Sequence, residues 1–171
     1  MSAYEVIRAK RAIRHFTDQP ISDEVAHTII NAGRLAQSSK NLQERMFIAV
    51  RDKVTLQALS KSGPWTGHLA GAAMGVAILT PDPNIKFQLM FDAGQSAAYM
   101  QLAAWELGVG SCLATVYEPE LVRSILGFPE EWHARICISF GYPTPEAIAP
   151  RSAHPEGRKE FDEVVRWDRW S

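Results

Sequence analysis

The chain has 171 residues, of which 46% are hydrophobic, and its 18 basic and 19 acidic side chains leave a formal net charge of -1. This composition predicts one folded domain over residues 1–171 and excludes a protein that attracts nucleic acid through its overall charge. No apolar run approaches the roughly 20 residues that a membrane-spanning helix needs, so we expect a cytoplasmic protein with no membrane partner.

A cluster of basic residues marks the first predicted element. Residues 3–10 favour a helix, and Arg8, Lys10, Arg11 and Arg14 crowd around its end. Like charges at near-helical spacing repel one another, so a solvated helix face would not need this many cations. The cluster therefore predicts a bound anion, and a solvated helix end is the plainer alternative.

A second helix is predicted to begin after Ser22, whose hydroxyl can cap it. A polar loop at 37–43 follows this helix, and polar loops delivered by strand edges commonly hold ligands. Strands are predicted at 46–50, 74–79, 111–116 and 136–140, and further helices at 54–60, 91–107 and 119–126.

The helix predicted at 91–107 is the longest in the chain and carries many small side chains. These would let a second helix approach closely, which favours a dimer interface here. The small residues are Ala93, Gly94, Ala97, Ala98, Ala103 and Ala104.

The composition changes after Gly141. Four prolines and one glycine predict a segment without regular structure. They are Pro143, Pro145, Pro150, Pro155 and Gly157. The apolar side chains of residues 161–170 should dock on the body of the chain or on a neighbouring subunit, so residues 142–171 are interpreted as an extended arm.

Several common functional motifs are incomplete or missing. Gly108-Val109-Gly110 has Leu113 where a dinucleotide fingerprint needs its third glycine, and no GxxxxGK[ST] motif occurs. The histidines show no metal-ligand spacing, so we expect no metal site and assign them surface or packing roles. They are His15, His27, His68, His133 and His154.

The serines and cysteines are weak candidates for a catalytic nucleophile. Ser38, Ser39 and Ser111 lie in no nucleophile elbow such as GxSxG. Cys112 and Cys137 lie in apolar surroundings, where burial disfavours the reactive thiolate. We expect both to be buried free thiols of a reducing compartment.

A second cationic pair, Arg158 and Lys159, follows the proline-rich segment. Guanidinium groups present paired donors to phosphate oxygens, so this pair and the N-terminal cluster together predict a phosphate site. Cations, small hydroxyl and amide side chains, and glycine turns are typical of a protein that binds a cofactor and lets the cofactor carry the reaction.

Four stretches of the chain resemble motifs of one family. Residues 10–16 (KRAIRHF) resemble an RRSIRxF opening, and residues 37–43 (QSSKNLQ) resemble a PSxxNxQ loop. Residues 92–112 are similar to a DxGxAxQN...LGLGS helix and turn, and residues 158–165 are similar to a terminal RxPLEEVV. In this order, and over nearly the full length, the chain resembles the nitroreductase-like FMN oxidoreductases.

This resemblance implies an α+β fold in which helices flank a mixed central sheet. It also implies an obligate homodimer with two FMN sites at the interface. The C-terminal arm, residues 142–171, would cross to the partner subunit and add a strand there.

The resemblance also assigns candidate FMN-binding residues and no metal. Lys10, Arg11 and Arg158, with Ala12 and Lys159 beside them, would surround the phosphate, and Arg14 would lie at the ring edge that carries N1 and O2. Ser38, Ser39 and Asn41 would come from the other subunit. The backbone of Ala114, Thr115 and Val116 would run beside the ring face, and no side chain need act as an acid or base.

The implied activity transfers hydride from NADH or NADPH to flavin N5 and then reduces an electron-poor acceptor such as a nitroaromatic or quinone. The alternative from another functional class is a flavin-binding sensor or storage protein without NAD(P)H turnover. A nucleic-acid binder is disfavoured because no aromatic residues are interleaved with the N-terminal cations.

The chain also departs from the family pattern. Ala12 replaces a serine and Lys10 an arginine, so we expect a lower affinity for FMN. Gln37 and the pair Glu44-Arg45 also differ from the family pattern in and after the polar loop. The sequence therefore leaves open the shape of this loop and the role of Gln43. A short segment at 61–68 offers only Trp65 and His68 as substrate contacts, which predicts an open site.

Overall fold

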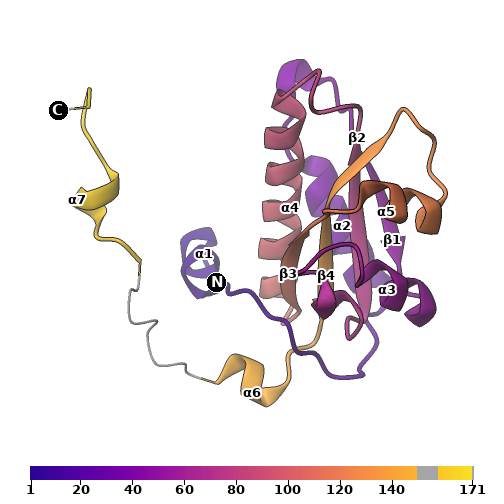
Figure 1. The fold of residues 1–171 in the computed structure, drawn as a ribbon. Helices are drawn as coiled ribbons and strands as arrows, with labels where there is room; N and C mark the ends of the chain where they lie inside the picture. Colours follow the sequence, from indigo (N-terminus) through magenta and orange to yellow (C-terminus); the bar gives the residue numbers. More distant parts are fainter. Residues whose placement is uncertain (150–157, 171) are drawn as a thin grey trace.

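A four-stranded sheet lies between two helical layers in the computed structural model, which describes residues 1–149 and 158–170 (Figure 1). Its strands are β1 (Met46–Val50), β2 (Met74–Thr80), β3 (Gly110–Thr115) and β4 (His133–Gly141), in the order β1-β2-β4-β3. The described helices are α1 (Ala3–Ala9), α2 (Asp23–Leu35), α3 (Lys53–Leu59), α4 (Gln88–Glu106), α5 (Pro119–Leu126), α6 (Pro145–Ile148) and α7 (Phe161–Val164). Two short 3-10 turns, η1 (Ser39–Asn41) and η2 (Gly67–Leu69), lie in loops.

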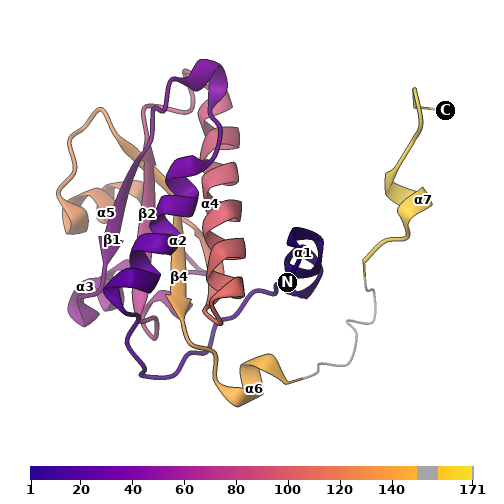
Figure 2. The same cartoon turned by 180° about the vertical axis from the view of Figure 1, so that it is seen from behind.

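Helices α2 and α4 pack side by side on one face of the sheet (Figure 2). Alternate residues of the central strands point to this face, as the two-residue period of a strand requires. Val76 and Ile78 of β2 meet Ile138 of β4 and Met100 of α4 in one buried cluster. The intervening residues of both strands pack against α3, α5 and η2 on the opposite face. The α+β class expected from the resemblance is confirmed.

The predicted helices and strands occur at nearly their expected positions. Ser22 caps α2 by accepting a hydrogen bond from the backbone N–H of Val25, and a capping box of Ser2 and Glu5 begins α1. The helix expected at 119–126 is α5 with the same bounds. No helix within the described ranges is long and apolar enough to cross a membrane.

The expectation of a mixed sheet needs a correction. All three strand pairs, β1 with β2, β2 with β4 and β4 with β3, are antiparallel. The parallel contact at this sheet is an isolated bridge between Ala12 and Ser111. The reason is that the N-terminal segment touches the edge strand β3 at this one point, which is too short a pairing to form a strand.

The start of the C-terminal arm also differs from the prediction, because Pro145–Ile148 form one helical turn, α6. Thr144 caps this turn, and Pro145 occupies its first position, where the fixed backbone angle of proline suits a helix and its missing N–H costs nothing. Pro150, Pro155, Gly157 and His154 lie outside the described residues.

Residues 158–170, which include α7, stand apart from the sheet, on the side of the molecule where α1 lies (Figure 1). The apolar side chains of this end are exposed within the single chain: Phe161, Val164, Trp167 and Trp170, the last at 90%. The expectation that this segment docks on a partner subunit therefore stays a prediction.

The basic N-terminal segment is anchored to the sheet edge. The Ile13 side chain is buried, and its backbone N–H donates to the carbonyl of Ser111 at 2.9 Å. A Cβ added to Gly110 would lie 2.8 Å from Ile13, so only a glycine lets the two backbones approach this closely. These contacts fix the backbone between Lys10 and Arg14.

A buried arginine shapes the polar loop that follows α2. Arg45 is 7% exposed, and its guanidinium donates to the carbonyls of Arg34, Ala36 and Gln37. These carbonyls end α2 and lack helical partners, so the guanidinium satisfies what the helix leaves open. Arg45, which departs from the family pattern, therefore stabilises the conformation of the loop.

We expect Arg45→Met to destabilise the protein by about 2–4 kcal/mol, because it removes a charged donor from several buried carbonyls. Arg51→Met is the matched control, since Arg51 pairs with Asp23 at the other end of α2 with side chains 44% and 95% exposed. Such exposed pairs contribute about 0–1 kcal/mol. Urea unfolding at neutral pH measures both, and equal losses would contradict the role given to Arg45.

Candidate functional site

Side chains from both ends of the chain meet at one cavity. It has a volume of about 650 Å³ and lies between the segment after α1, helix α4 and the arm. Its lining residues include Lys10, Arg11, Ala12, Gln101 and Arg158. Thus three predicted phosphate-binding cations and Ala12 are brought together within one subunit, whereas Lys159 is exposed beside them.

Lys10 is held at this cavity by a residue that sequence reasoning missed. Its ammonium group donates to Gln101 Oε1 at 2.6 Å, and Gln101 is itself buried on α4. Burial lowers the pKa of Lys10, partly offset by the nearby Cys112. A signal for Gln101 existed in the sequence, because it is a polar residue within the small-residue face of the longest helix.

Arg11 reaches the same cavity while holding the arm. Its guanidinium donates to the carbonyl of Ile148 at 2.7 Å and to that of Ala149 at 3.4 Å. These carbonyls end α6, so Arg11 satisfies them in the way that Arg45 satisfies the end of α2.

No carboxylate within the described residues pairs with the cations of this cavity. The ion pairs within the described residues lie elsewhere and join Arg51 to Asp23, Lys86 to Glu44, and Arg123 to Glu120. The positive charges of Lys10, Arg11 and Arg158 therefore act together on the space between them, which favours an anion.

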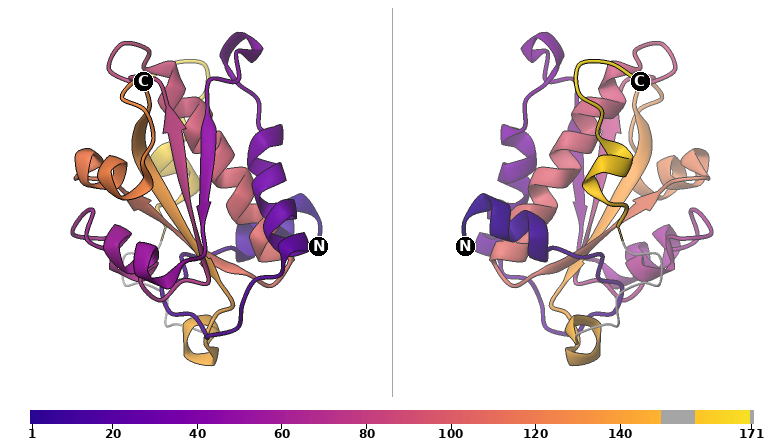
Figure 3. Two further views of the ribbon diagram at one scale, coloured as in Figure 1. Left: turned by 90° about the vertical axis from the view of Figure 1, so that its right-hand side faces the viewer. Right: turned by 90° about the vertical axis from the view of Figure 1, so that its left-hand side faces the viewer.

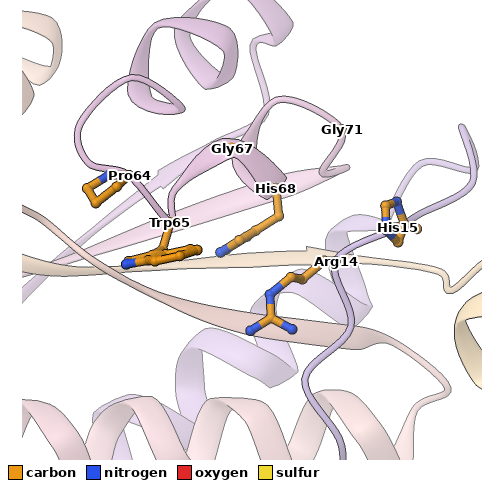
Figure 4. Close-up of a pocket in the computed structure, with 7 residues that line it drawn as sticks. All are labelled: Arg14, His15, Pro64, Trp65, Gly67, His68 and Gly71. Carbon is orange, nitrogen blue, oxygen red and sulfur yellow. The ribbon is translucent and has the colours of Figure 1, made fainter. Parts of the chain in front are cut away.

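Arg14 lines a second cavity, of about 640 Å³, under the loop that contains Trp65 (Figure 4). Trp65 is 74% exposed and stands at its edge, and the His68 ring points into the same space (Figure 4). His15 lies on the other side of Arg14. The cavity is therefore lined by one cation, two imidazoles and one indole face.

His68 is buried and hydrogen-bonded on one side only. Its Nδ1 lies 2.7 Å from Ser139 Oγ, while its Nε2 is buried without a hydrogen-bond partner. Burial, and then the charge of Arg14, lowers the His68 pKa to about 4, so the ring is neutral at neutral pH. The packing role expected for His68 therefore does not account for its Nε2 atom, which is buried without a hydrogen-bond partner.

The predicted ring-face segment consists of Ala114 and Thr115 at the end of the edge strand β3 and of Val116, which follows it. Ala114 is buried in the core, and Thr115 and Val116 line a third cavity of about 430 Å³ with Arg135. The cysteines Cys112 and Cys137 are buried free thiols, as expected. Burial raises the pKa of Cys137 to about 12, which leaves it without thiolate character.

The loop with Ser38, Ser39 and Asn41 lies near the start of α4, at the opposite end of this helix from α1 (Figure 3). The Ser39 backbone N–H donates to both carboxylate oxygens of Asp92 at 3.1 Å. Asp92 and Gln101 are separated by roughly 14 Å of helix at 1.5 Å per residue. One subunit therefore does not bring this loop to the cations.

The same loop has an unusual backbone. Lys40, Asn41 and Gln43 adopt positive φ angles of 51°, 55° and 54°, and the Gln43 backbone N–H donates to Ser38 Oγ at 3.0 Å. Residues other than glycine rarely adopt a positive φ angle. The contacts with Asp92, Ser38 and Arg45 hold the loop in this shape.

No cluster of three potential metal ligands occurs in residues 1–149 and 158–170.

A family model described as the Nitroreductase family matches residues 7–63 and 57–142. A protein of Archaeoglobus fulgidus, whose name pairs NADH dehydrogenase with NAD(P)H nitroreductase, is 33% identical over 150 residues, covering 83% of this chain and 86% of that protein. An NADPH-flavin oxidoreductase of Vibrio harveyi is 31% identical over 172 residues, covering 88% of this chain and 70% of the other.

Solved structures agree with this assignment of the fold. An FMN-dependent nitroreductase of Clostridium difficile superposes with a TM-score of 0.85 and 27% identity, covering 96% of this chain and 98% of its own. The NADPH:FMN oxidoreductase of Vibrio harveyi, solved with NAD+, has a TM-score of 0.85 at 24% identity and covers 99% of this chain and 78% of its own.

The lowered pKa of His68 predicts an acid-sensitive fold. Between the ordinary pKa of 6.5 and the folded value of about 4, the unfolded chain binds a proton that the folded chain does not. Stability from this residue is complete above about pH 6.5 and falls as the pH decreases toward 4, by about 1.4 kcal/mol per unit of pKa separation.

We therefore expect His68→Gln to lose less stability than the wild type when the pH is lowered from about 7 to about 4.5. The matched control is His27→Gln on the exposed surface of α2, which should keep the wild-type acid dependence. Urea unfolding at both pH values measures the difference. A parallel acid dependence in His68→Gln and the wild type would contradict this prediction.

Proposed function

Because the chain belongs to the nitroreductase family, we propose that it is an FMN-dependent oxidoreductase that passes reducing equivalents from NADH or NADPH to an electron-poor acceptor. The observation that carries the proposal is the meeting of Lys10, Arg11 and Arg158 at one cavity. These cations come from opposite ends of the sequence and have no carboxylate partners among the described residues.

The side chains of this cavity fit a phosphate group. A phosphate monoester carries about two negative charges at neutral pH, and one ammonium and two guanidinium groups suit it in charge and in donor number. The burial that lowers the Lys10 pKa also weakens its hydration, so an anion beside it restores the lost stabilisation. Lys10, Arg11 and Arg158 would hold the phosphate of FMN.

Arg14 would lie at the pyrimidine edge of the flavin ring, in the cavity that it shares with Trp65 and His68. When bound, FMN supplies hydride transfer through its N5 atom. The guanidinium of Arg14 would stabilise negative charge at the ring edge. The backbone of Ala114, Thr115 and Val116 would flank the ring.

The proposal includes a homodimer in which each site is completed by the other subunit. In support, the loop with Ser38, Ser39 and Asn41 contacts Asp92 near the start of α4, whereas Lys10 contacts Gln101 near its end, so a second copy would supply the loop. Large apolar side chains are exposed on α4 and on the arm, including Phe91, Tyr99, Trp167 and Trp170, and such surfaces are typical of interfaces.

The acceptor class follows from the Trp65 cavity. An indole face at its edge would stack on a planar ring, and the exposure of Trp65 leaves room for different rings. We propose a nitroaromatic or a quinone as the acceptor, both of which are planar and electron-poor. The buried free thiols of Cys112 and Cys137 support a reducing cytoplasmic location.

The first test is anaerobic reduction of the purified protein loaded with FMN. We expect a yellow protein whose flavin absorbance is bleached rapidly by NADH or NADPH and restored by a nitroaromatic or a quinone. A yellow protein that neither nicotinamide bleaches would support a flavin-binding sensor or storage protein instead. A protein that does not bind FMN would exclude both functions.

The second test concerns the cation that the arm supplies. Arg158→Ala should weaken FMN binding by about 10- to 100-fold, because a hydrogen bond to a charged group is worth about 1.5–3 kcal/mol. Arg166→Ala is the matched control, since Arg166 lies on the same arm and stacks over Trp170 with 5.5 Å between its guanidinium and the ring centroid. Quenching of FMN fluorescence gives the dissociation constants, and equal effects of the two variants would remove Arg158 from the phosphate site.

A further inference from the structure

The open nitrogen of His68 is the feature of the Arg14 cavity that the proposed function leaves unused. The residue is 9% exposed, lines the cavity and buries an Nε2 atom that has no hydrogen-bond partner. A buried polar atom without a partner costs free energy, so its position indicates a ligand atom that would satisfy it. Figure 4 shows the ring directed into the space beside Arg14 and Trp65.

The hydrogen bonds behind His68 determine which proton the ring carries. Ser139 is fully buried, and its hydroxyl lies 2.7 Å from His68 Nδ1 and 3.4 Å from the Cys112 carbonyl oxygen. A carbonyl oxygen can only accept, so the hydroxyl donates its single proton to Cys112 and accepts from the Nδ1–H. The reverse tautomer would make only one of these two contacts.

This arrangement leaves Nε2 with a bare lone pair. The charge of Arg14, the cation that lines the same cavity, also favours a lone pair over an N–H dipole at this place. His15, the other titratable residue of the lining, lies on the opposite side of Arg14 (Figure 4). The cavity therefore offers one fixed cationic donor, Arg14, and one neutral acceptor, His68.

We propose that Ser139 and His68 make Nε2 a hydrogen-bond acceptor in the Arg14 cavity, where it selects a neutral amide edge that presents an N–H next to a carbonyl. The carbonyl oxygen of the ligand accepts a hydrogen bond from the Arg14 guanidinium, and the N–H of the ligand donates to His68 Nε2. His68 is then a binding residue, and Ser139 is a positioning residue that acts through it.

Two molecules of the proposed reaction carry this chemistry, so the inference rests on the proposed function. The flavin ring has an imide N3–H between two carbonyls, and the nicotinamide of NADH has a carboxamide. The shared feature is a neutral amide edge. A carboxylate would be selected against at His68, because it bears no proton for Nε2 at neutral pH.

The tautomer is tested first, in the folded wild-type protein, by nitrogen NMR of ¹⁵N-labelled histidine. We expect His68 to be protonated at Nδ1 and bare at Nε2 at neutral pH. In Ser139→Ala the Nδ1 partner is gone, and we expect a mixture of the two tautomers. A wild-type ring protonated at Nε2 overturns the proposal without any binding measurement.

The ligand is tested by comparing FMN with 3-methyl-FMN, which lacks the N3–H. If the flavin edge is the ligand, the wild type should bind 3-methyl-FMN about tenfold more weakly than FMN. His68→Ala, which leaves room for the methyl group, should bind the two alike, and His68→Gln should recover part of the discrimination through its amide oxygen.

The nicotinamide is tested as the ligand with the same variants. If the carboxamide is the ligand, His68→Ala should raise the KM for NADH several-fold while the FMN dissociation constant and the discrimination against 3-methyl-FMN stay at wild-type values. If neither FMN discrimination nor the KM for NADH depends on His68, the proposal is wrong while the proposed function stands. A wild-type protein that does not bind FMN overturns both.

Discussion

Like charges that backbone contacts hold together repel one another unless an anion lies between them, and this constraint organises the molecule. Burial of Ile13 against Gly110 fixes the segment with Lys10 and Arg11 at the sheet edge, and the arm brings Arg158 to the same cavity. The ion pairs within the described residues, formed by Asp23, Glu44 and Glu120, involve other cations. The fold thus maintains a local positive potential in a chain whose net charge is close to zero.

Much of the fold could be predicted from the sequence because the signals are local. The helical spacing and the hydroxyl of Ser22 determine the start of α2, and the apolar run predicted at 74–79 lies in the fully buried strand β2. The family could also be recognised, since its motifs lie in short stretches such as 10–16. The cation cavity combines two of those stretches, and therefore the residues proposed for it were all visible in the sequence.

The rest depends on contacts between distant residues, which no local pattern reports. His68 and Ser139 look like unremarkable residues of a loop and a strand until the sheet places them 2.7 Å apart. The same holds for Lys10 and Gln101. Prolines misled the prediction at α6, because Pro145 at the first position of a turn supports a helix rather than preventing it.

Arg11 links two parts of the molecule through one side chain. A guanidinium has five N–H donors, and Arg11 uses one on the carbonyl of Ile148 and one on that of Ala149. The remaining donors are available to the cavity that Arg11 lines. An anion bound in that cavity would therefore share the Arg11 guanidinium with the end of α6, at the start of the C-terminal arm.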